Sequence, residues 1–234
     1  MTTIAERMQA VRHNIDEAAR HVGRSPESVR LLAVSKTHSC ELIREAFSAG
    51  QACFGENYVQ EALDKIATLA DLPIEWHFIG PIQSNKTRPI AESFDWVHGV
   101  DRLKIAQRLN DARLDQLAPL NICLQVNVSG EASKSGCAPE EVAELAQAVA
   151  AMPRLKLRGL MAIPEPTDDV ALQHQRFRML AQLRDALNDH GFALDTLSMG
   201  MSDDYPAAIA EGSTIVRVGT AIFGQRQYGL QKND

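Results

Sequence analysis

Short apolar runs alternate with amphipathic segments along the whole chain, and this alternation constrains the fold more than any other feature. The runs are rich in branched residues, as expected for strands buried on both faces of a parallel sheet. The segments between them carry apolar residues at three- and four-residue spacing, which indicates helices. About eight such runs are present, at residues 29–36, 52–57, 74–80, 96–100, 120–128, 155–163, 194–202 and 213–224.

Eight strands that alternate with helices predict a single (β/α)8 barrel of the TIM type. The rival is a doubly wound open sheet, which usually has a glycine-rich turn after its first strand. The first run ends in Ser35-Lys36-Thr37 without a glycine, so the barrel is favoured. An additional helix is predicted over residues 4–22 and ends at Gly23. Since no helix is evident after the last run, this N-terminal helix would complete the outer ring.

The length of 234 residues suits one barrel of this kind. No internal repeat, low-complexity tract or long linker divides the chain. We therefore expect one domain over residues 1–234, with a short C-terminal tail at about 225–234. Only the stretches 129–139 and 164–169 are expected to be loose, as loops on the same face of the barrel.

The charge balance excludes several classes of function. The chain has 24 Lys and Arg against 30 Asp and Glu, a net charge of −6, which argues against nucleic-acid binding. No apolar run approaches the roughly 20 residues needed to cross a bilayer, and the N-terminus lacks the apolar core of a signal peptide.

The four cysteines lack metal-ligand spacing and are expected to be reduced, with Cys53 and Cys123 buried. We expect a cytoplasmic protein without membrane partners.

Polar residues fall at the carboxyl ends of the predicted strands, where barrel enzymes build their sites. A lysine at a barrel mouth can be partly desolvated, which lowers its pKa and gives the free amine needed for Schiff-base chemistry with an aldehyde. The ordinary alternative is a solvated lysine at a strand end. The polar or small residues at the carboxyl ends of the predicted strands are Lys36, Asn57, His77, Asn127, the run 198–202, and Gly219-Thr220.

Small residues in the later parts of the seventh and eighth runs suggest an anion site. Their backbone N–H groups lie just before a short helix, where the helix dipole favours a phosphate. A capped helix beside a tight turn is the alternative. Asp203 and Asp204 would repel a phosphate, so we expect them to point away and to cap the helix. The residues of the predicted cradle are Ser198, Gly200, Met201, Ser202, Gly219 and Thr220.

Arg217 lies inside an apolar strand, where a charged side chain needs a partner. It could form an ion pair with Glu56 or Glu165, or it could present a permanent cation to a ligand. His77 could equally be a satisfied core histidine, and Asn57 could simply end its strand.

Six sequence blocks are recognisable and follow one another along nearly the whole chain. They are SKTH (35–38), FGENYVQE (54–61), WHFIGPIQSNK (76–86), LMAIP (160–164), LSMGMSDD (197–204) and GSTIVRVGTAIFG (212–224). Together they resemble the pyridoxal-phosphate homeostasis proteins, the YggS/PROSC family. That family is similar to the barrel domain of fold-type III pyridoxal-phosphate enzymes such as alanine racemase.

The resemblance implies pyridoxal 5′-phosphate held as an internal aldimine by Lys36, with Arg217 facing the pyridine nitrogen. It implies that Asn57 and His77 line the ring pocket, and that the run 198–202 and Gly219-Thr220 hold the phosphate. The sequence departs from the family pattern at His38-Ser39, where Lys-Pro is common, and at Tyr205-Pro206, in a stretch that often includes an acid.

The function expected from the resemblance is intracellular vitamin B6 homeostasis and amino-acid metabolism without robust turnover. Apo-enzymes that require pyridoxal phosphate would be the recipients, and a monomer is expected. The alternatives are a fold-type III racemase or decarboxylase, and a phosphate-binding barrel enzyme without a Schiff base. Racemisation needs a second acid–base group on the opposite face, in related racemases a tyrosine from a further β domain. The expectation is that this chain has no room for that domain and only Tyr58, Tyr205 and Tyr228.

Overall fold

Eight parallel strands close into a barrel in chain order, as the alternation predicted. The computed structural model describes residues 2–130 and 135–225. Each strand pairs with the next along the chain, and β8 pairs with β1 to close the ring. The strands are β1 (Arg30–Val34), β2 (Cys53–Glu56), β3 (Glu75–Phe78), β4 (Trp96–Val100), β5 (Leu120–Gln125), β6 (Leu155–Met161), β7 (Thr196–Ser198) and β8 (Ile215–Val218).

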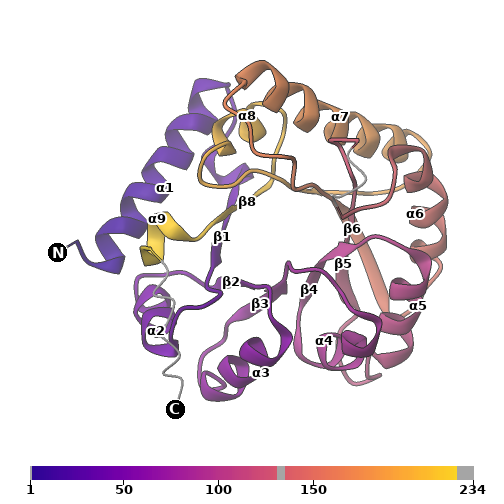
Figure 1. Ribbon diagram of the computed structural model, residues 1–234, viewed down its shortest axis with the longest axis horizontal. Coiled ribbons are helices and arrows are strands. Elements are labelled where there is room, and N and C mark those ends of the chain that lie inside the picture. The colour runs from indigo at the N-terminus through magenta and orange to yellow at the C-terminus, as the bar shows by residue number, and fades with distance from the viewer. Residues whose placement is uncertain (1, 131–134, 226–234) are drawn as a thin grey trace, which may run out of the picture.

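The helices form a ring outside the strands (Figure 1). Three short 3₁₀ turns, at Pro26–Ser28, Ser84–Lys86 and Pro139–Glu141, supplement them. The helices are α1 (Ile4–His21), α2 (Cys40–Ser48), α3 (Val59–Thr68), α4 (Thr87–Ser93), α5 (Leu103–Ala112), α6 (Val142–Ala150), α7 (Val170–Asp189), α8 (Tyr205–Ala210) and α9 (Thr220–Phe223).

The N-terminal helix completes the outer ring, which confirms the sequence prediction. It contacts α2, α8 and α9. It ends just before Gly23, whose φ of 71° is the left-handed conformation that glycine adopts at low cost. The four-residue helix α9 after the last strand was not predicted, because so short a segment shows no periodicity. The tail predicted at about 225–234 lies outside the described residues except for Gln225.

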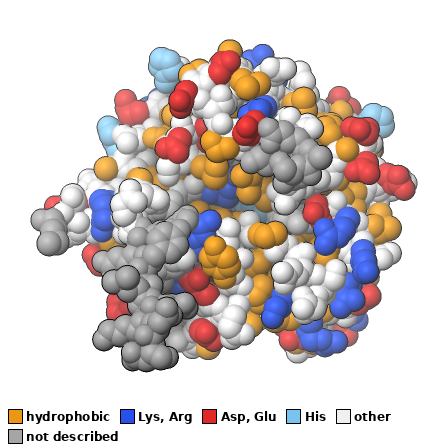
Figure 2. All heavy atoms as spheres, viewed as in Figure 1, with side chains coloured by type: hydrophobic (Ala, Val, Ile, Leu, Met, Phe, Trp, Pro, Cys, Tyr) orange, Lys and Arg blue, Asp and Glu red, His pale blue; other side chains and the backbone are white. Residues whose placement is uncertain are grey.

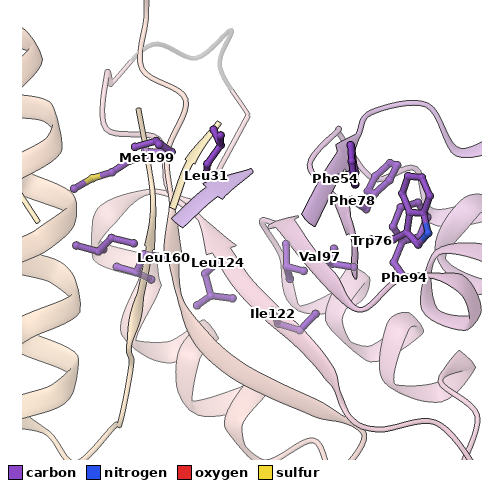
Figure 3. Packing of buried hydrophobic residues seen from close by; sticks show 14 of the residues in the cluster. Leu31, Phe54, Trp76, Phe78, Phe94, Val97, Ile122, Leu124, Leu160 and Met199 are labelled. Atoms are coloured by element: carbon purple, nitrogen blue, oxygen red, sulfur yellow. The ribbon is translucent and has the colours of Figure 1, made fainter. Parts of the chain in front are cut away.

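The main hydrophobic core lies between the strands and the helices, where Phe54, Phe78 and Phe94 are fully buried (Figure 3). Two smaller apolar clusters lie apart from this main core. One contains Leu32, Cys53, Ile79 and Ile215, and the other contains Trp96, Cys123 and Met161.

The four cysteines are free thiols, and the predicted burial of Cys53 and Cys123 is confirmed. Burial raises the pKa of Cys123 to about 12. The two stretches predicted to be loose meet on one face, since the Glu165 amide donates to the Ser129 hydroxyl over 3.1 Å. Within the described residues, no helix combines the length and the apolar character that crossing a membrane requires.

A buried ion pair behind β1 fixes the backbone on both sides of Lys36. The Lys65 ammonium, on α3, donates to the Ser35 carbonyl and the Glu56 carboxylate, each over 2.8 Å. Glu56 also accepts from the Ser35 hydroxyl. Glu61 accepts from both the Lys65 ammonium and the Thr37 amide. We call Ser35, Thr37, Glu56, Glu61 and Lys65 the β1 clamp, because they hold the residues before and after Lys36.

Removal of the ammonium from the clamp should destabilise the fold in a pH-dependent way. We expect Lys65→Met to cost about 3–5 kcal/mol at neutral pH, because it leaves a buried carboxylate unpaired. Burial already raises the Glu56 pKa and Lys65 lowers it, so the substitution raises that pKa further. Since a carboxyl with a raised folded pKa is penalised only when ionised, the loss should be small below the unfolded pKa and grow as pH rises.

Urea unfolding at pH 5 and pH 8 measures this effect. The double variant Glu56→Gln/Lys65→Met should recover much of the stability and lose the pH dependence. Lys156→Met, at an exposed position on β6, is the control and should change little. Equal losses for Lys65→Met at both pH values would contradict the charge argument.

Candidate functional site

A cavity of about 390 Å³ opens at the carboxyl ends of the strands, and it collects most of the residues predicted from the sequence. Barrel sites lie at this end because the loops after the strands gather there. Basic side chains lie near the centre of the face shown in Figure 2, among hydrophobic ones. The cavity is lined by Val34, Lys36, His38, Asn57, Ile79, Ile163, Met201, Ser202, Asp203, Arg217, Gly219 and Thr220.

Five of the predicted site residues do not line this cavity. Asn127 lines a separate pocket with Val128 and Met179, and Met199 is fully buried. Ser198 is fully buried and lies behind Arg217, to which its hydroxyl is hydrogen-bonded. His77 is fully buried and hydrogen-bonded to Glu75 and His98. Gly200 adopts a φ of 95°, and a Cβ there would lie 2.7 Å from a side-chain atom of α8. Gly200 therefore shapes the loop after β7 without facing the cavity.

Lys36 follows β1 and reaches the cavity from the segment that the β1 clamp holds. Next to it, Thr37 has a φ of 65°, the only positive φ of a non-glycine residue in the described ranges. This conformation costs energy in a β-branched residue and persists only where the surroundings enforce it. The clamp supplies that enforcement through the Glu61 carboxylate, which accepts from the Thr37 amide.

Arg217 is a buried cation at the base of the cavity, with 3% of its surface exposed. Its Nη1 donates to the Ser198 carbonyl over 2.6 Å and to the Ser198 hydroxyl over 2.8 Å. Its Nη2 donates to the Ala162 carbonyl over 2.8 Å. Burial lowers the Arg217 pKa to about 10, so the guanidinium is charged at neutral pH.

The ion pairs considered for Arg217 are wrong. Glu56 pairs with Lys65 in the clamp, and Glu165 pairs with Arg176 over 3.3 Å. Backbone carbonyls and a serine hydroxyl take the place of a carboxylate partner, so the positive charge is not neutralised by direct contact.

Four residues of the predicted anion cradle line the cavity. They are Met201 and Ser202, after β7, and Gly219 and Thr220, after β8. A Cβ on Gly219 would lie 3.0 Å from the backbone oxygen of Val34, so glycine allows β8 and β1 to approach closely here.

The two aspartates after this run do not behave as expected. Asp204 is the N-cap residue of α8, but its side chain makes no capping bond to that helix. It accepts instead from the Met201 amide over 2.6 Å, and burial raises its pKa. Asp203 lines the cavity. Pro206 lies in the first turn of α8, as predicted.

Asn57 has a buried side-chain oxygen that a ligand in the cavity could satisfy. Its Oδ1 is buried and has no hydrogen-bond partner among the described residues. Unpaired buried polar atoms cost free energy and are rare in folded proteins. Asn57 lines the cavity, so a polar ligand there could satisfy this atom.

Sequence reasoning missed several residues of the site. His38 lines the cavity and stacks on Phe223, with ring centroids 5.0 Å apart. The clamp residue Lys65 occupies a buried position on the inner side of α3, beside Ala62. A lysine at a core-facing position of an amphipathic helix, four residues after a glutamate, was the signal that could have identified the clamp.

Comparison with known proteins places this chain among relatives of nearly equal length. It is 65% identical to a pyridoxal phosphate homeostasis protein of Pseudomonas aeruginosa over 229 residues, which is 98% of each chain. The family model described as alanine racemase, N-terminal domain, matches residues 7–227.

Solved structures agree on the fold. PipY of Synechococcus elongatus, solved with PLP bound, superposes with a TM-score of 0.83 at 38% identity and covers 95% of this chain and 100% of its own. An alanine racemase from Corynebacterium glutamicum superposes with a TM-score of 0.71 at 16% identity, and the match covers 95% of this chain but 63% of the racemase. The likeness to the racemase shows a common fold alone. By the identity and coverage of its relatives, this chain belongs to the family of pyridoxal phosphate homeostasis proteins.

Proposed function

We propose that this chain binds pyridoxal 5′-phosphate in the cavity at the carboxyl ends of the strands and holds it covalently on Lys36. The observation that carries the proposal is that a lysine and a buried arginine share one cavity with two loops of small residues. The bound cofactor would supply an aldehyde carbon, which the lysine amine attacks with loss of water. The name shared by the relatives and the PLP bound to PipY support the same ligand.

The residues of the cavity fit the three polar parts of this ligand. The Ser202 hydroxyl and the backbone around Gly219-Thr220 suit a phosphate, since small residues allow close backbone approach. Arg217 carries only donors, which suits a ring nitrogen that accepts. The unpaired Asn57 Oδ1 suits a polar ring substituent.

We propose a carrier role in vitamin B6 homeostasis, with apo-enzymes as recipients and a monomer as the working form. The leading alternative is a racemase or decarboxylase of the same fold. Racemisation requires acid–base groups on opposite faces of the substrate. Neither Tyr58 nor Tyr205 lines the cavity, and Tyr228 lies outside the described residues. Lys36 and His38 line the cavity from the same segment after β1. Two groups from one segment are poorly placed to act on opposite faces of a substrate, which favours the carrier.

A phosphate-binding barrel enzyme without a Schiff base is the third reading. It would use the two loops after β7 and β8, but it gives no shared reason for Lys36 and Arg217 to line the same cavity. We therefore place it last.

Borohydride should trap the cofactor on Lys36. Reduction converts the carbon–nitrogen double bond to a stable amine, and peptide mass spectrometry then locates the adduct. We expect one modified peptide that contains Lys36 and none in Lys36→Ala. The exposed residue Lys86 should stay unmodified. Recovery of most of the label on another lysine would reject the assignment.

The phosphate should contribute several kcal/mol to binding, because charge-assisted hydrogen bonds are stronger than neutral ones. Pyridoxal should therefore bind much more weakly than pyridoxal phosphate in a fluorescence titration. We expect Ser202→Ala to weaken the phosphate ester by about 1 kcal/mol, roughly fivefold. Ser48→Ala, at an exposed position on α2, is the matched control. Equal affinities for the two vitamers would show that the anion site lies elsewhere.

The loaded protein should exchange the α-proton of alanine or serine slowly, if at all, in deuterated buffer. The reason is that neither of the two tyrosines among the described residues lines the cavity to act as the second acid–base group. NMR integration of the α-proton over hours measures the rate. Turnover of about 1 per second or faster that is abolished in Lys36→Ala would favour the racemase over the carrier.

A further inference from the structure

A chain of hydrogen bonds runs through the barrel interior and ends at Arg217. The Glu75 carboxylate lies 2.6 Å from His77 Nε2, and His77 Nδ1 lies 2.9 Å from His98 Nε2. His98 Nδ1 lies 2.8 Å from the Ser198 hydroxyl, which in turn lies 2.8 Å from Arg217 Nη1. We call these five residues the interior chain. Because β4 and β7 are not neighbours in the barrel, the bond from His98 to Ser198 crosses its interior.

The two ends of the interior chain fix the direction of every bond within it when both imidazoles are neutral. An ionised carboxylate only accepts hydrogen bonds, so His77 donates from Nε2 to Glu75. A neutral His77 then accepts at Nδ1 from His98 Nε2, and a neutral His98 accepts at Nδ1 from the Ser198 hydroxyl. Ser198 accepts in turn from Arg217, whose guanidinium only donates. Both imidazoles thus carry their proton on Nε2.

The surroundings support neutral histidines at both positions. His77 and His98 are fully buried, and burial lowers the pKa of each. The charged groups that act on them are Glu75, Arg30 and Asp95 at His77, and Arg217 and Arg30 at His98.

Packing and the terminal carboxylate fix the far end of the chain. Trp96 stacks on the His77 ring, with centroids 5.3 Å apart and an interplanar angle of 8°. Burial opposes ionisation of Glu75, but the hydrogen bonds from His77 and Arg30 and the positive charge of Arg30 outweigh it and hold the Glu75 pKa below its usual range. The chain thus ends on a permanent anion at neutral pH.

A metal site is the competing explanation for this end of the chain. Cys53, Glu75 and His77 each offer a ligand atom, all within 4.8 Å of one another. However, Arg30 Nη2 lies 2.8 Å from Cys53 Sγ and 2.6 Å from Glu75 Oε1. The guanidinium is already bonded to two of the three ligands, and its charge would repel a metal ion. The cluster therefore serves to hold the Glu75 carboxylate.

We propose that Glu75, at the amino-terminal end of β3, is a positioning residue for the cavity at the opposite end of the barrel. It acts through His77, His98 and Ser198, which orient the Arg217 guanidinium and polarise its N–H groups. The role for the cofactor rests on the proposed function, because Arg217 would meet the ring there. The orientation of the chain itself holds in the protein without cofactor.

Nitrogen-15 NMR of the side chains tests the orientation without any cofactor. We expect His77 and His98 both to be neutral with the proton on Nε2 between pH 6 and 8. A proton on Nδ1 of either ring, or an imidazolium at pH 7, would overturn the proposal. This measurement on the unsubstituted protein needs no variant to fold.

Two variants separate the links of the chain. Glu75→Gln replaces a pure acceptor by an amide that also donates, so His98 should show mixed tautomers although its own bonds are to His77 and Ser198. The Arg217 guanidinium signals should shift as well. Ser198→Ala should shift Arg217 while His77 keeps its tautomer. Glu211→Gln is the matched control, because Glu211 pairs with His174 and Arg178 outside the interior chain. Unchanged His98 and Arg217 signals in Glu75→Gln would overturn the relay.

Pyridoxal phosphate titration adds the second arm. We expect Ser198→Ala to weaken binding about tenfold, the size of one charge-assisted hydrogen bond, and Glu75→Gln to shift the absorption maximum of the bound cofactor. Wild-type affinity and spectrum in both variants would reject the effect on the cavity. Failure of the unsubstituted protein to bind pyridoxal phosphate would reject the proposed function, whereas the tautomer pattern would still decide the orientation of the chain.

Discussion

Burial of the Arg217 guanidinium inside a closed barrel requires that its N–H groups find acceptors away from water. The barrel supplies two backbone carbonyls and the Ser198 hydroxyl, and none of these is charged. An uncompensated buried cation is costly, and the structure offsets that cost with geometry rather than with a carboxylate contact. The positive charge therefore remains available to an anionic or electron-rich ligand in the cavity, on which the proposed function depends.

The fold followed from the sequence because the alternation of apolar runs with segments of three- and four-residue apolar spacing continues along the whole chain. The eight strands and the outer-ring role of α1 follow from burial patterns alone, whereas the four-residue helix α9 has too few residues for a pattern. Site residues next to strand ends, such as Lys36 and Ser202, were predictable because the barrel brings those ends together.

The remaining site residues could not be placed from the sequence, since their positions depend on pairs distant along the chain. His77 was predicted to line the ring pocket, but its Nδ1 bonds to His98, 21 residues away. Asp204 was expected to cap α8, yet it accepts from the Met201 amide. Tertiary packing decides which hydrogen-bond partner each of these side chains meets, and a local sequence pattern does not encode that partner.

The β1 clamp also governs which amine an aldehyde can reach. The Lys65 ammonium has three protons, and these meet three acceptors, the Ser35 carbonyl and the carboxylates of Glu56 and Glu61. An ammonium held in this way has no lone pair to offer to a carbonyl carbon. Although Lys65 approaches the same backbone that carries Lys36, it is chemically silent. Lys65 is also buried and does not line the cavity that Lys36 lines, so its three partners and its burial both keep it from an electrophile that enters the barrel mouth.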